Sequence, residues 1–84
     1  MLEKQIVVDL IEIIENGSVQ VRTATKIIED GKELNRTFNR HVVAPGDDYS
    51  QEDDRVKAVC AAVHTPEVIA AYQAMMEANK PVEA

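Results

Sequence analysis

Two turn dipeptides, Asn16-Gly17 and Asp30-Gly31, divide the first half of the chain into three runs rich in β-branched residues. Asn-Gly and Asp-Gly readily adopt the positive φ angles that two-residue β-hairpin turns require. The spacing therefore predicts a three-stranded antiparallel β-meander over about residues 4–43. Strands of about ten residues exceed the usual five or six, so such a sheet needs more cover than one short helix provides.

A strand register follows if each dipeptide lies at the centre of its turn, because Glu15 then pairs with Ser18 and Glu29 pairs with Lys32. Paired residues share a face of the sheet. The face that we expect to be the core carries Ile6, Val8, Leu10, Ile14, Val19, Val21, Ile27, Leu34, Phe38 and Val42. The opposite face carries Val7, Ile11, Ile13, Arg22 and His41.

The second half of the chain shows two helix start signals after a loop over residues 44–50, in which Pro45-Gly46 ends the third strand. Ser50 with following acidic residues predicts the N-cap of a helix over about 51–64. Thr65-Pro66 predicts the start of a second helix over about 66–79. We therefore expect one α+β domain over residues 1–84, with both C-terminal helices packed on one face of the sheet.

The composition bounds the classes of partner. A formal net charge of −6 over 84 residues, with scattered basic side chains, argues against nucleic acid as the partner. The longest apolar stretch is too short to span a bilayer, and the single Cys60 allows no intramolecular disulfide. We expect no membrane partner and synthesis in a reducing compartment.

Few residues could carry chemistry. Acidic side chains crowd residues 47–54, and a hard cation could bind there, but the spacing lacks the pattern of an EF-hand loop. His41 and His64 have no evident catalytic neighbours, and Cys60 lies on an apolar helix stripe typical of a core residue. We predict no enzyme activity, no catalytic residue, no cofactor and no metal site, with cation binding by the acidic segment left open.

The first strand has apolar side chains on both expected faces and forms an edge of the meander. A long apolar edge invites another chain to pair or pack against it. We therefore predict an interface at Val7, Ile11 and Ile13, with Arg22 and His41 as its polar rim. The alternative is that the C-terminal helix folds over this second face.

One set of segments carries a further signal: Val19-Gln20-Val21-Arg22-Thr23-Ala24-Thr25, Glu29-Asp30-Gly31, Arg40-His41, Pro45-Gly46-Asp47-Asp48 and Thr65-Pro66-Glu67-Val68-Ile69. As a set they resemble a family of short proteins encoded among the virion and tail genes of tailed bacteriophages, from about Ile6 to Tyr72. His64 departs from the family pattern, which commonly has an aromatic residue before the Thr-Pro pair. The resemblance implies a small structural component of the particle, present in several copies, with no known chemistry.

These observations together predict a small bacteriophage virion protein that acts by protein–protein assembly, most simply in the tail or tail fibre. Its expected partners are other virion proteins and copies of itself, in an oligomer. It would be made in the host cytoplasm and reside in the virion. Two alternatives stay open: a capsid decoration or cement protein, and a tail assembly chaperone that is absent from the virion.

Overall fold

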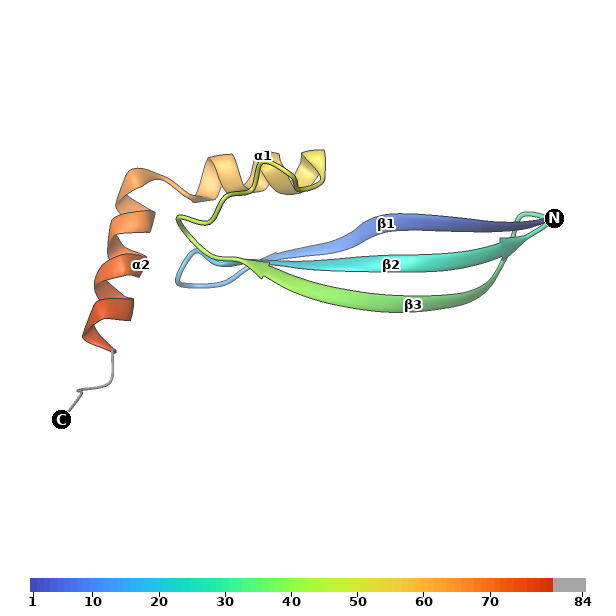
Figure 1. The fold of residues 1–84 in the computed structure, drawn as a ribbon, viewed down its shortest axis with the longest axis horizontal. Helices are drawn as coiled ribbons and strands as arrows, with labels where there is room; N and C mark the ends of the chain where they lie inside the picture. The colour runs from blue at the N-terminus through green and yellow to red at the C-terminus, as the bar shows by residue number, and fades with distance from the viewer. Residues whose placement is uncertain (80–84) are drawn as a thin grey trace.

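The computed structural model describes residues 1–79 and contains a three-stranded antiparallel sheet followed by two helices (Figure 1). The strands are adjacent in the order β1-β2-β3. This architecture confirms the predicted α+β fold. The elements are β1 (Leu2–Ile13), β2 (Val19–Glu29), β3 (Lys32–Val43), α1 (Asp54–Val63) and α2 (Pro66–Ala78).

The turn between β2 and β3 has the predicted two-residue form. Asp30 and Gly31 have φ angles of 51° and 80°, and Glu29 pairs with Lys32. Two consecutive positive φ angles are the signature of a type I′ turn, whose twist matches that of the flanking strands. The sequence rule for Asp-Gly therefore holds at this turn.

The turn between β1 and β2 is one residue longer than predicted. Ile14 N donates to Ser18 O at 3.0 Å, and Gly17 N donates to Ile14 O at 2.9 Å. Three residues, with Gly17 at a φ of 92°, therefore lie between the closing pair, as in hairpins that end in a glycine bulge. Asn-Gly permits either geometry, so the dipeptide alone did not fix the register.

This extra residue reverses the predicted faces of β1 next to the turn, over residues 10–13, because a slip of one residue moves side chains to the other side of a sheet. The register shift between Val8 and Leu10 restores the predicted faces of residues 2–8. Ile11 lies opposite Val21, and Ile13 lies opposite Val19. Two further register shifts occur. One lies in the β1–β2 pairing, between Val8 and Leu10, and the other lies in the β2–β3 pairing, between Ile27 and Ile28. The predicted core assignment of six residues is wrong: Ile6, Ile14, Leu34, Phe38 and Val42 are exposed, and Leu10 lies on the other face, opposite Arg22.

The core lies at the helix end of the sheet. Val19, Val21 and Val43 pack there against Val56 and Cys60 of α1, and all five side chains are buried. The N-cap of α1 is Asp53, whose Oδ1 accepts from Arg55 N at 2.9 Å, and Ser50 is not the cap. Ser50 N instead donates to Asp48 Oδ1, so this residue closes a turn in the preceding loop.

The second helix does not pack on the sheet face, which corrects the predicted arrangement. It begins as expected, because Pro66 is at its first turn and Thr65 Oγ1 accepts from Val68 N at 3.2 Å. However, α2 lies beyond the end of the sheet, near the β1–β2 turn (Figure 1). Only two residues separate the helices, and the first of them, His64, contacts Gly17 O at 2.8 Å, so α2 starts at the turn.

The helices therefore leave much of the sheet uncovered. The molecule measures 58 × 31 × 20 Å, and the sheet extends away from both helices along its length (Figure 1). We call this extension the arm and define it as residues 2–8, 23–29 and 32–39, which the strand register places side by side. The arm exposes Leu2, Ile6 and Leu34 by 65%, 64% and 54%.

Candidate interaction site

The five side chains predicted to form one interface do not share a face. Ile11 and His41 lie opposite Val21 in neighbouring strands, on the face that α1 covers. Val7 lies opposite Ala24 and Arg22 opposite Leu10, on the other face. The three-residue turn and the two register shifts separate them, so the predicted patch is wrong as a single surface.

The apolar members of that set have different surroundings. Ile11 packs against the core cluster beneath α1, and not beneath the C-terminal helix as the alternative expected. Val7 is half-buried, and Ala24 opposite it is fully buried. Ile13 remains 56% exposed beside the β1–β2 turn. Of the three, Ile13 is the side chain most available to another molecule.

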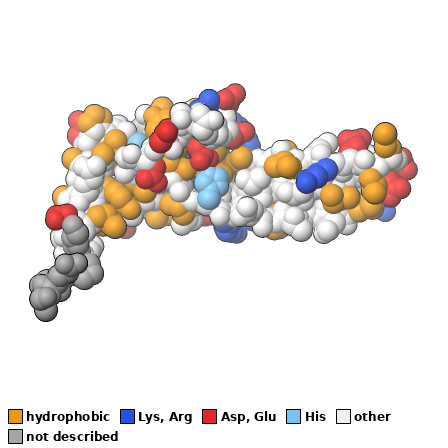
Figure 2. Space-filling model, viewed as in Figure 1, with side chains coloured by type: hydrophobic (Ala, Val, Ile, Leu, Met, Phe, Trp, Pro, Cys, Tyr) orange, Lys and Arg blue, Asp and Glu red, His pale blue; other side chains and the backbone are white. Residues whose placement is uncertain are grey.

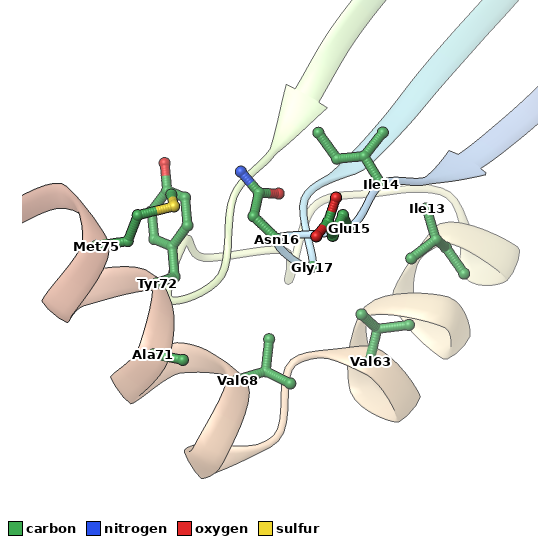
Figure 3. A pocket seen from close by; sticks show the side chains of 10 residues that line it. All are labelled: Ile13, Ile14, Glu15, Asn16, Gly17, Val63, Val68, Ala71, Tyr72 and Met75. Carbon is green, nitrogen blue, oxygen red and sulfur yellow. The ribbon is translucent and has the colours of Figure 1, made fainter. Parts of the chain in front are cut away.

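Ile13 lines an apolar pocket of about 340 Å³ between the β1–β2 turn and α2 (Figure 3). Val68, Tyr72 and Met75 of α2 face the turn across this pocket, and Val63 of α1 closes one side. None of the α2 side chains, all within the described residues, is buried. The pocket is thus a hollow in an exposed apolar surface.

His64 is buried and connects the C-terminal end of α1 to the β1–β2 turn. Its Nε2 lies 2.8 Å from Gly17 O, and its backbone N–H donates to Cys60 O. The ring also meets Tyr49 edge-on, with 6.3 Å between ring centroids. Its ring thus contacts a carbonyl of the β1–β2 turn. The contact is between residues 47 positions apart, which no local pattern indicates.

Arg22, which was predicted to lie at the polar rim of the interface, is already paired with other side chains of the same chain. Its Nε and Nη2 donate to the two carboxylate oxygens of Asp9 at 2.9 Å each. Its guanidinium also stacks on Phe38, 4.4 Å from the ring centroid. The hydrogen bond from Arg22 is the main reason that the pKa of Asp9 is lowered, with Arg36 adding to the effect.

His41 sits near the helix end of the β3 edge and contacts Glu52 Oε1 at 2.7 Å. A second hollow of about 190 Å³ is lined by both expected rim residues, Arg22 and His41, together with Glu12 and Arg40. Glu12 and Arg40 lie 4.0 Å apart and are both well exposed. This hollow brings Arg22 and His41 together.

The acidic segment is organised by backbone hydrogen bonds. Asp47 and Asp53 accept from backbone amides, and so does Asp48, whose pKa the contact with Ser50 lowers. Among residues 1–79 there is no group of three or more His, Cys, Asp or Glu side chains placed to hold a metal ion. Cys60 is buried, and burial raises the pKa of its thiol.

Sequence reasoning missed the exposed apolar side chains of the arm, since it assigned Ile6, Leu34 and Phe38 to the core. The strand lengths could have indicated this exposure, because a twelve-residue strand is much longer than a ten-residue helix and extends beyond it. Figure 2 shows hydrophobic side chains gathered at both ends of the visible face, over the arm and over α2. These two regions are the candidate interaction surfaces.

Comparisons of the chain with protein-family models, with curated proteins and with solved structures gave no match. Within the described residues, none of the helices has the length and apolar character needed to cross a membrane.

Proposed function

We propose that this chain is a small structural protein of a tailed-bacteriophage particle, associated with the tail or tail fibre, and that it works by assembling with other protein chains. The proposal combines two lines of support. The family resemblance of the sequence supports a role in the particle. The shape of the folded chain supports assembly as the mode of action.

The observation that carries assembly is the uncovered arm. Three strands extend past the helices, and Leu2, Ile6, Leu34 and Phe38 are each more than half exposed on them. Ile6 lies opposite Thr25 and Phe38 opposite Ala24, so each face of the arm exposes a large apolar side chain that a partner protein can cover. Both sheet edges also carry unpaired backbone groups that can hydrogen-bond to another strand.

The second helix supports the same conclusion. An isolated helix of thirteen residues is only marginally stable in water, and most helices are stabilised by burying an apolar face. In α2 no side chain is buried, and Met75 and Met76 are exposed. Flexible methionine side chains suit a surface that adapts to a partner.

Mass spectrometry of purified particles, with estimation of copy number, tests the proposal. We expect the chain to be a constituent of the particle in a small multiple of three or six copies, as the symmetry of a tail requires. Hundreds of copies per particle would place the chain in the head as a decoration or cement protein. Absence from particles, with retention in assembly intermediates, would contradict the virion role and indicate a tail assembly chaperone.

A further inference from the structure

We propose that the apolar pocket between the β1–β2 turn and α2 binds a basic amphipathic helix of another protein. The inference rests on the assembly part of the proposed function, because it names the chemistry of one partner and the surface that receives it. Of the interface residues predicted from the sequence, it retains Ile13.

The pocket runs along one side of α2. Val68, Tyr72 and Met75 follow one another at spacings of four and three residues, which places them in a row on one face of this helix. Ile13 and Ile14, next to the β1–β2 turn, form the opposite wall (Figure 3). The volume of about 340 Å³ lies near the lower limit of about 300 Å³ for ligand-binding clefts, so the pocket suits a few side chains.

The walls of the pocket remain exposed. Ile13 and Met75 are 56% and 37% exposed, and no side chain of α2 is buried. The apolar side of α1 is covered by contrast, since Val56 and Cys60 are fully buried in the core. The second helix is therefore the one whose apolar side is available to a partner.

The hydrogen bonds around the pocket favour a helix as the occupant. Backbone groups inside a helix bond to one another, so α2 offers no edge to which a strand could be added. In the turn, Ile14 N donates to Ser18 O and Gly17 N donates to Ile14 O. Contacts in the pocket are therefore made by side chains. A helix can insert an apolar side there while its own backbone stays hydrogen-bonded.

The charges around the pocket select a basic partner. Residues 12–21 and 58–79 include all the residues that line it, and these two segments contain no Lys or Arg. Their side chains that are charged at neutral pH are Glu12, Glu15, Glu67 and Glu77. A partner whose apolar side is flanked by Lys or Arg would be attracted to this end of the molecule, and an acidic one would be repelled.

Two of these glutamates are available for pairing with a partner. Glu12 already pairs with Arg40. The carboxylates of Glu15 and Glu67 form no ion pair or hydrogen bond within residues 1–79. Glu15 lines the pocket itself, and Glu67 directly precedes Val68 on α2. The unpaired negative charges thus lie at the rim of the apolar surface.

The same charges argue against a second copy of this chain as the occupant. Two copies that met through α2 would bring Glu15 and Glu67 of one copy close to the same carboxylates of the other. The first helix of a second copy carries two basic side chains and one acidic side chain, but its apolar side is already buried on its own sheet. The inferred partner is therefore a different protein.

Binding of synthetic peptides to the full chain tests the inference. The probe is a fluorescein-labelled leucine–lysine peptide with its leucines on one side of a helix, and in the matched peptide glutamate replaces every lysine. By fluorescence anisotropy we expect the lysine peptide to bind, and to bind more weakly as the salt concentration rises. The glutamate peptide should bind at least about tenfold more weakly. A chain that does not bind the lysine peptide, or binds both peptides equally, would overturn the inference.

Two double variants locate the binding. I13S/M75S removes apolar side chains of the pocket, and E15Q/E67Q removes its unpaired charges; all four side chains are exposed, and folding is checked by circular dichroism. We expect I13S/M75S to weaken binding of the lysine peptide at least about tenfold, because less apolar surface is buried. E15Q/E67Q should weaken it at least about threefold, because two exposed ion pairs are lost. Folded variants that bind like the wild type would overturn the inference.

Matched controls make the same kinds of change to exposed side chains of the arm, in I6S/L34S and E3Q/E29Q. Both should bind the lysine peptide like the wild type, and controls as weak as the pocket variants would overturn the inference. A wild-type oligomer in sedimentation velocity that I13S/M75S dissociates, and I6S/L34S does not, would overturn it in favour of a second copy. A chain without residues 80–84 that binds the peptide much more tightly would overturn it in favour of the chain's own C-terminal residues.

These outcomes are separate from those of the particle experiment. A chain that is present in particles but does not bind the lysine peptide would overturn this inference and leave the virion role standing. A chain that binds the peptide in its pocket but is absent from particles would contradict the virion role and leave the pocket's function standing.

Discussion

Gly17 lies where the β1–β2 turn meets α2, and it shows how single residues set the geometry of this molecule. Its φ of 92° is in the region that favours glycine. A Cβ at this position would lie 2.5 Å from Val68 Cγ1, so the close approach of the turn and α2 also requires the absence of a side chain. His64 then fixes the same turn through the Gly17 carbonyl.

Replacing Gly17 by alanine should therefore destabilise the fold through both backbone strain and the clash with Val68. We expect a loss of about 2–4 kcal/mol in the free energy of unfolding, measured by urea denaturation. Gly31→Ala is the matched control, because Gly31 also has a positive φ, 80°, but a Cβ there would meet no atom within 4 Å. It should lose only about 1–2 kcal/mol. Equal losses at the two positions would show that α2 does not pack against the turn.

Asp9 provides a pH-dependent prediction. Because Arg22 lowers the pKa of Asp9 in the folded state, this carboxylate stabilises the fold above the ordinary carboxyl pKa. The contribution is lost as the pH falls through the lowered folded-state value. Asp9→Asn should thus unfold at a lower urea concentration than the wild type at neutral pH, and the difference should shrink in acid. A difference that stays constant with pH would show that the Asp9–Arg22 pair does not carry this contribution.

At the scale of elements, the two hairpins show what sequence patterns can and cannot predict. Strand and helix identity, the Asp-Gly turn, and the Thr65-Pro66 helix start all follow from local chemistry, and the structure confirms them. The geometry of the Asn16-Gly17 turn did not follow from local chemistry, because two- and three-residue loops satisfy the same local rule. The residues that this turn contacts, His64 and Val68, lie far along the chain. A register shift of one residue moves side chains to the other face of the sheet. The predicted interface is therefore wrong, although the predicted fold class is confirmed.

The different burial of the elements predicts different local stabilities. The central strand β2 is hydrogen-bonded on both sides and carries Val19 and Val21 in the core, whereas α2 buries no side chain. Hydrogen–deuterium exchange of the dilute protein should show amides of α2 exchanging much faster than those at the core end of β2. Thr65→Ala should speed exchange in α2 further, by removing its cap, and leave β2 unchanged. Coincident exchange of both elements would show that they unfold as one unit.

At the scale of the whole molecule, the chain combines a small core with an arm that it cannot cover. The strand lengths indicated from sequence that the sheet would need more cover than one short helix could give. The strand register and the position of α2 determine which side chains stay uncovered. No local sequence pattern predicts either of them. Ile6, Leu34 and Phe38 are consequently exposed instead of buried. We therefore propose the arm as the surface through which this protein meets other chains.

The most direct test of that claim compares backbone hydrogen–deuterium exchange of the arm in dilute, dissociated protein with exchange in the assembled state, in its own oligomer or in purified particles. Assembly should slow exchange along residues 2–8 and 32–39, whose outward-facing amides gain hydrogen-bond partners. Exchange in the arm that is equally fast in both states would contradict the account, because another chain would then not cover this surface.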